Sequence, residues 1–179
     1  MFASHIADRE PSSGTRKVAT ECDVTLVYGD PTLRIITSRN VLFTLWSDAP
    51  TVPQLGHILT AAKDLRTSWP KGVAQAQLVL KGTPRFSDAV RADSVALLKK
   101  KAEYVNLALA YVVLAHGLAG TAARAFLSTL VLLSRTQTPT RVFAELPTAS
   151  QWLALQFAAS DVAWSPADLE RVCRQVIAG

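Results

Sequence analysis

The residues best placed to do chemistry lie in the segment AHGLAGT, residues 115–121, between an apolar run and a long apolar stretch. If the run is a strand and the stretch a helix, the first backbone N–H groups of the helix point toward any anion at the turn. Gly117, Gly120 and Thr121 are therefore candidate anion-binding residues. A tight turn also needs glycine for steric reasons alone, so the same residues fit a purely structural turn.

His116 stands one residue beyond the apolar run and could act as a general base beside a suitable partner. The sequence pairs it with no nucleophile and no acid. His5 and His57 are too dispersed to suggest a metal site, and no dinucleotide-binding, P-loop, serine-hydrolase or zinc-protease motif occurs. We therefore expect a protein that is not an enzyme and that uses no cofactor and no metal. An enzyme using the His116–Gly117 turn is the alternative.

The net charge of +5 is concentrated in residues 81–101, which carry six basic and two acidic side chains. Arg85, Arg91, Lys99 and Lys100 are candidates for contact with an acidic protein, a phosphate or an anionic membrane surface. The alternative is a solvated helix whose last-turn lysines, residues 99–101, complement the helix dipole. Basic and aromatic residues are not interleaved, so we expect no nucleic-acid binding.

Turn signals and hydrophobic periodicity predict the elements that hold these residues. The chain is strand-like over residues 24–28 and 33–37, and residues 41–46 follow after the three turn residues 38–40. Two β-rich runs joined by three turn residues predict an N-terminal hairpin. Strands near 75–82, 107–115 and 140–145 then alternate with helices. Helix starts are predicted near Thr51, at Ser87 or Asp88, at Pro147 and at Ser165, where Ser-Pro-Ala-Asp is a strong signal.

Strands that alternate with helices imply right-handed crossovers. We expect an α/β fold with a mainly parallel four- to five-stranded sheet, an N-terminal hairpin, covering helices and an extra C-terminal helix.

Residues 107–133 read LALAYVVLAHGLAGTAARAFLSTLVLL, with one Arg, one His and no acid. One membrane helix over this stretch would place Arg124 near mid-bilayer, at about 2.5–3.5 kcal/mol on insertion scales. The glycine-containing break predicts instead a buried strand followed by a separate helix. The two cysteines form no metal motif and the N-terminus has no signal-peptide core. We expect a cytoplasmic protein with no transmembrane segment.

The helix in the second half of this stretch carries more apolar surface than one contact with a sheet consumes. Phe126, Leu127, Leu130 and Val131 are candidates for an apolar interface or a ligand-binding face. Three occupants stay open for the surplus surface: the C-terminal helix with its own apolar stripe, a second copy of the chain, or a lipid.

The element order and several segments resemble a stand-alone bacterial STAS domain, the fold of anti-sigma-factor antagonists, in its STAS/CRAL-TRIO-like branch. LALAYVVLAHGLAGTAARAFLSTLVLLSRTQTPTRVFAELPTASQWL has that branch's apolar strand, small-residue turn, long apolar helix and Trp-Leu helix. LVLKG and PRFSDAVRADS resemble its third strand and the entry to its second helix. The resemblance implies a STAS-like domain over residues 22–159. We also expect a flexible N-terminal tail over residues 1–21 and a C-terminal helical extension over residues 160–179 that packs on the domain or a partner.

In antagonists of this family, a partner kinase phosphorylates a serine at the start of the second helix, and this switches partner binding. The resemblance implies Ser87 or Ser94 as phosphoacceptor, although the usual Asp-Ser-Ser-Gly-type sequence is absent. Ser87 also fits a purely structural N-cap. We therefore expect a regulatory protein-interaction module in signalling, with a protein partner and a homodimer as an open alternative. A carrier or sensor of an apolar, lipid-like ligand is the second hypothesis.

Overall fold

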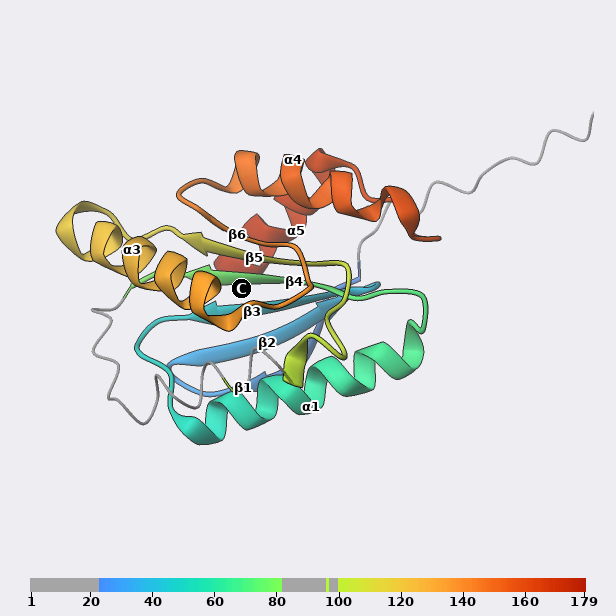
Figure 1. The fold of residues 1–179 in the computed structure, drawn as a ribbon, viewed down its shortest axis with the longest axis horizontal. Coiled ribbons are helices and arrows are strands. Elements are labelled where there is room, and N and C mark those ends of the chain that lie inside the picture. Colours follow the sequence, from blue (N-terminus) through green and yellow to red (C-terminus); the bar gives the residue numbers. More distant parts are fainter. Residues whose placement is uncertain (1–22, 82–95, 97–99) are drawn as a thin grey trace, which may run out of the picture.

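The computed structural model describes residues 23–81, 96 and 100–179, which form one sheet with helices on both faces (Figure 1). The strands are β1 (Thr25–Gly29), β2 (Leu33–Ser38), β3 (Val41–Trp46), β4 (Ala74–Val79), β5 (Ala108–Val113) and β6 (Thr140–Phe143). The helices are α1 (Val52–Ser68), α3 (Gly117–Ser134), α4 (Leu146–Gln156) and α5 (Pro166–Ala178). A short 3-10 helix, η1 (Phe157–Ala159), follows α4.

The strands lie side by side in chain order, β1-β2-β3-β4-β5-β6. β1, β2 and β3 pair antiparallel, whereas the pairs β3–β4, β4–β5 and β5–β6 are parallel. The predicted α/β class and the N-terminal hairpin are confirmed. The predicted count of four to five strands is wrong, because residues 25–29 form a separate edge strand in a sheet of six.

The turn after β1 explains this extra strand. Asp30 Oδ1 accepts hydrogen bonds from the backbone N–H groups of Thr32 and Leu33, at 2.7 and 2.8 Å, which fixes the chain reversal into β2. Gln54 on α1 donates to Asp30 Oδ2 at 2.8 Å and so ties the turn to the helix below the sheet. A register shift between Leu26 and Tyr28 gives β1 the bulge that is common in edge strands.

Two helices begin where the sequence predicts. α1 follows Thr51, which forms a capping box with Gln54. α5 follows Ser165, whose hydroxyl accepts the backbone N–H of Asp168 at 3.0 Å. The start predicted at Ser87 or Asp88 lies outside the described residues.

Among the described residues, α4 and α5 cover one face of the sheet and α1 and α3 cover the other (Figure 1). Along β3, Val41, Phe43 and Leu45 belong to the core under α4 and α5, whereas Leu42 and Trp46 pack with α1. α3 packs on that second face as well, over β5 and β6. The alternation follows from the two-residue period of a strand that is buried on both sides.

α5 forms part of the core on the α4 side. Leu169 and Val172 are fully buried there, and Arg34 Nη2 donates to the carbonyl of Val176 near the end of the helix at 2.7 Å. The indole N–H of Trp164 donates to Asn40 Oδ1 at 2.9 Å and fixes the segment before α5. α5 therefore lies on the opposite side of the sheet from α3, and it does not cover the outer surface of α3.

Candidate interaction surface

α3 begins at a turn built by two glycines. Gly117 has a φ of 67°, in the left-handed region where glycine is favoured. A Cβ on Gly120 would lie 1.9 Å from the carbonyl oxygen of Ala115, so only glycine lets the first turn approach the end of β5 this closely. The stretch 107–133 thus separates into strand and helix, as predicted.

One side of α3 packs on the sheet. Gly120, Ala123, Leu127, Leu130 and Ser134 are buried, at alternating spacings of three and four residues. They meet Leu109, Tyr111 and Val113 of β5. This contact buries one stripe of the helix and leaves the rest of its surface uncovered by the sheet.

The opposite side of α3 is exposed and carries no charged side chain. Leu118 is 91% exposed, Leu132 78% and Leu133 62%. Arg124, the one charged residue of the helix, is half-buried on the flank and donates to Thr121 Oγ1 at 3.2 Å. We call this side the outward face of α3, defined by the exposed residues Leu118, Thr121, Ala122, Ala125, Ser128, Thr129, Leu132 and Leu133.

None of the four residues proposed from the sequence for this interface lies on the outward face of α3. Leu127 and Leu130 are buried against β5, 8% and 5% exposed, so they serve the chain's own core. Phe126 and Val131 are half-buried and pack at the edge of the same cluster. The helix predicted to carry surplus apolar surface does have an exposed apolar side, but the four residues named from the sequence do not form it. The exposed leucines could have been found from their positions around the helix, since they fall between the positions that face the sheet.

α3 is also the one helix in the described part of the chain with the length and mean hydropathy, 1.4, of a membrane-crossing segment. Of that window, 28% is buried. A helix that lies on a sheet can have the same composition, so composition alone does not assign α3 to a membrane.

The residues predicted to bind an anion have structural roles in the turn before α3. His116 occupies the N-cap position but its side chain makes no capping hydrogen bond. Thr121 Oγ1 donates to the carbonyl of Gly117 at 3.2 Å, so this hydroxyl serves the helix itself. Gly117 and Gly120 meet the steric needs described above. The geometry therefore favours the structural interpretation of Gly117, Gly120 and Thr121.

Most of the predicted basic and phosphoacceptor residues lie outside the described residues, namely Arg85, Ser87, Arg91, Ser94 and Lys99. Lys100 is exposed, as expected for a lysine in the last turn of a helix. Lys101 is only 2% exposed, so the interpretation of the lysine run as fully solvated is wrong for this residue.

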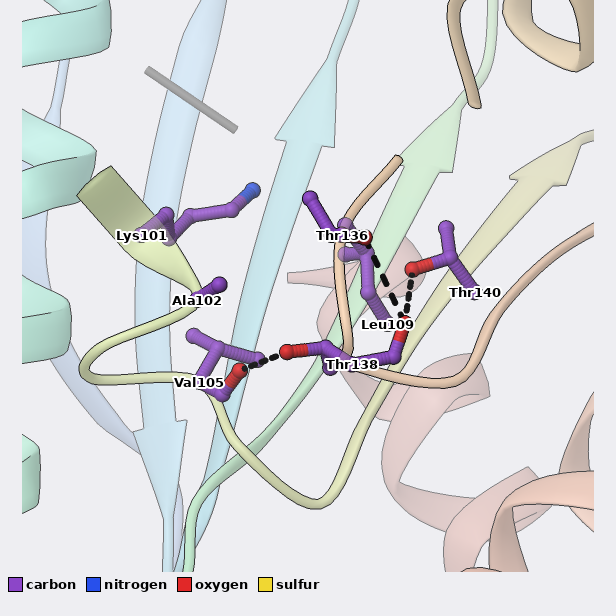
Figure 2. Close-up of a pocket in the computed structure, with 7 residues that line it drawn as sticks. All are labelled: Lys101, Ala102, Val105, Leu109, Thr136, Thr138 and Thr140. Carbon is purple, nitrogen blue, oxygen red and sulfur yellow. Dashed lines mark hydrogen bonds between the residues drawn. The ribbon is translucent and has the colours of Figure 1, made fainter. Parts of the chain in front are cut away.

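Lys101 lines a small cavity between the turn before β5 and the loop between α3 and β6 (Figure 2). Its side chain extends toward Thr136, and Thr138 and Thr140 complete the polar wall. Burial lowers the pKa of the Lys101 amine to about 7, because the charged form loses its hydration. A buried amine of this kind can be a nucleophile.

The cavity beside Lys101 is too small for a substrate. Its volume is about 10 Å³, roughly the space of one water molecule. Thr138 Oγ1 donates to the carbonyl of Val105 at 2.9 Å, and Thr140 Oγ1 donates to the carbonyl of Thr138 at 2.9 Å. Thr138 therefore fastens the α3–β6 loop to the turn before β5, and Thr140 supports the loop locally.

A second cavity, of about 170 Å³, lies at the end of β3 and is lined by Asp30, Arg34, Ser47 and Leu80 among others. Its carboxylate is not free to act as a base. Asp30 accepts hydrogen bonds from Gln54, Tyr28 and two backbone N–H groups. These donors, Gln54 first, hold the pKa of Asp30 well below its usual range. The network is a structural link between β1, β2 and α1.

Other reactive groups in the described ranges are buried or isolated. Burial raises the pKa of the Cys173 thiol to about 12, so it is an unreactive part of the core. No group of three or more His, Cys, Asp or Glu side chains that could hold a metal ion occurs within residues 23–81, 96 and 100–179.

Comparisons with protein-family models, curated proteins and solved structures gave no significant match.

Proposed function

We propose that this chain is a STAS-like, non-enzymatic protein-interaction domain whose contact surface is the outward face of α3. The observation that carries the proposal is an 18-residue helix with leucines 91%, 78% and 62% exposed and no charge among them. A fully buried leucine side chain contributes about 1.5–3 kcal/mol relative to an exposed one. A partner that covers this face gains that contribution at several positions at once.

The remaining chemistry of the described residues fits a binding role better than catalysis. The Asp30 carboxylate is saturated with donors, the Cys173 thiol is buried, and the Lys101 amine faces a cavity of about 10 Å³. None of these groups combines a reactive side chain with room for a substrate. The outward face of α3, by contrast, is an exposed apolar surface that has no role inside the described part of the fold.

The STAS part of the proposal rests on the sequence segments and on the order of elements. An apolar strand, a small-residue turn and a long apolar helix follow one another in residues 108–134, as in the family that the sequence resembles. A phosphorylation switch at Ser87 or Ser94 stays a prediction of that resemblance. Intact-mass and peptide mass spectrometry of the native protein tests it, and absence of phosphate from both serines would contradict it.

A matched pair of variants tests the proposed surface. Leu132 on α3 and Leu155 on α4 are similarly exposed, 78% and 72%, but lie on opposite faces of the sheet. Leu132→Glu and Leu155→Glu should both fold. Crosslinking of the chain to other proteins in its native cells should be lost in the Leu132→Glu variant and retained in the Leu155→Glu variant. Equal capture by the two variants would contradict the proposal.

The lipid-carrier hypothesis makes a different prediction for the same helix. Neither cavity described above is lined by α3, so the outward face is open rather than enclosed. A protein partner fits an open face better than a carried lipid, which needs shelter from water. Native mass spectrometry that finds a bound lipid, released by Leu132→Glu, would favour the carrier instead.

A further inference from the structure

The outward face of α3 has nearly the same residues in both directions from Ala125. Leu118 and Leu132 lie at equal distances along the chain on either side of it, and so do Thr121 and Thr129. All of these side chains are exposed, as are Ala122 and Ser128, which form the remaining pair of small residues. A surface of this kind matches a copy of itself turned by 180°.

We propose that two copies of this chain pair through α3, antiparallel, with a two-fold axis next to Ala125. The inference rests on the proposed function, since it names a second copy as the partner of the outward face. An isologous interface needs one patch that is complementary to itself. In this arrangement Leu118 packs on Leu132 of the second copy, and Ala122 packs on Thr129 of the second copy.

The spacing of the exposed residues supports a helix pair. Leu118, Ala122, Ala125, Thr129 and Leu132 follow one another at intervals of four and three residues, the pattern of a seam between two packed helices. Alanines at the centre allow the helix axes to approach to about 8 Å, the short end of the usual range. The leucines at the two ends then close over the seam.

The charge distribution also favours a copy over a charged partner. The outward face has no charged side chain, so pairing of two copies there buries no charge between them. Arg124 lies on the flank, where its guanidinium is held by Thr121 of its own helix. A strongly basic or acidic partner would find no complementary charge on this face.

The length of the helix sets the expected strength. Eighteen residues span roughly 27 Å, so a seam of one helix per chain lies at the small end of specific interfaces, near or below about 1,200 Å² in total. The dimer is therefore expected to be weak and in exchange with monomer.

Disulfide trapping tests the pairing on the full chain. In a Cys22→Ser background, Ala125→Cys places one cysteine of each copy beside the two-fold axis, at a separation compatible with a disulfide. Thr60→Cys, exposed on α1, is the matched control for random collision. Under mild oxidation the Ala125→Cys chain should form a covalent dimer at least tenfold faster than the control, and an added Leu118→Glu change should abolish that advantage.

Sedimentation velocity of the unmodified chain gives an independent readout. The proposal predicts a monomer–dimer equilibrium that Leu132→Glu shifts fully to monomer and Leu155→Glu leaves unchanged. A chain that stays monomeric up to several hundred micromolar, with equal trapping rates for both cysteines, would overturn it. So would binding of the monomer to neutral phosphatidylcholine vesicles through α3. Loss of cellular crosslinks in Leu132→Glu alongside such a monomer would leave the proposed function standing and reject only the homodimer.

Discussion

α3 and α5 each present an apolar stripe to the sheet, but their outer sides differ. On α5 the stripe of Leu169, Val172 and Val176 is buried, and the outer side carries ion pairs from Arg171 to Asp168 and from Arg174 to Glu170. On α3 a buried stripe is also present, yet the outer side carries leucine, alanine, serine and threonine.

This difference indicates whether the outer side of each helix faces solvent or a binding partner. Charged pairs keep a helix in water and contribute a few tenths of a kcal/mol each. Exposed leucines contribute nothing while they face solvent, so three of them on one side of α3, with no charged side chain among them, point to an occupant. The two helices of one chain thus serve as each other's controls.

The largest expected effect is the difference in stability loss between truncating a buried leucine on α5 and truncating an exposed leucine on α3. Leu169→Ala, at a fully buried position on α5, should lower the free energy of unfolding by about 2–5 kcal/mol because it leaves a cavity. Leu132→Ala on α3, 78% exposed, should change it by less than about 0.5 kcal/mol under monomeric conditions. Urea unfolding of dilute protein measures both. Comparable losses would mean that the side of α3 carrying Leu132 is covered within the monomer.

The next effect is the pH dependence of stability, which should arise on the face of the sheet that α3 covers. The α4/α5 face is lined by an apolar cluster, whereas the α1/α3 face also contains Lys101 with a pKa of about 7. Between that pH and the ordinary lysine value near 10.4 the unfolded chain holds a proton that the folded chain has lost. The free energy of unfolding should therefore rise with pH in this window, by up to about 1.4 kcal/mol per unit.

Lys101→Met should remove this rise, and it should stabilise the protein most at or below pH 7, where the folded state carries the full cost of the buried charge. Lys100→Met, at the exposed neighbour, should keep the wild-type profile. Chemical unfolding at several pH values makes the comparison. A wild-type profile in both variants would show that Lys101 titrates as a solvated lysine.

A smaller effect tests how closely α3 approaches the sheet. Gly120→Ala should lower the unfolding free energy by about 1–3 kcal/mol, since the new methyl group meets the carbonyl of Ala115 at 1.9 Å before relaxation. Gly56→Ala on α1 meets nothing within 4 Å and should be neutral or stabilising by up to about 1 kcal/mol. Thermal unfolding of the pair checks this. An unchanged Gly120→Ala protein would contradict the tight turn.

The smallest effect belongs to the outer side of α5. Arg174→Ala removes an exposed pair with Glu170 and should cost about 0.3–0.5 kcal/mol or less. High salt should reduce even this difference, because screening acts on exposed charges. A loss above 1 kcal/mol would show that the outer side of α5 is not simply solvated.

Much of the fold could be predicted because its signals are local. Ser165 with Asp168 marks the start of α5, the glycines at 117 and 120 separate β5 from α3, and alternating apolar runs mark the strands. The six-strand count was missed because β1 is mostly exposed and depends on the contact between Asp30 and Gln54, which lie far apart in sequence.

The candidate surface could be predicted only in part for the same reason. Hydrophobicity alone identifies α3, but Leu127 and Leu118 differ only in which side of the helix they occupy, and the sheet decides which side is buried. Lys101 and Gln75 show that burial of polar residues could not be predicted from residue type either. Both are polar in sequence and fully or nearly buried in the fold, and Gln75 Oε1 has no hydrogen-bond partner among the described residues.

Site-specific photocrosslinking compares the two helices most directly. A photoreactive amino acid at Ser128, exposed on α3, and another at Arg174, exposed on α5, should be introduced into the full chain in its native cells. The outward face of α3 predicts discrete protein adducts from position 128, a dimer of this chain among them, and none from position 174. Equal adducts from both positions, or none from 128, would contradict the claim that α3 is the contact surface.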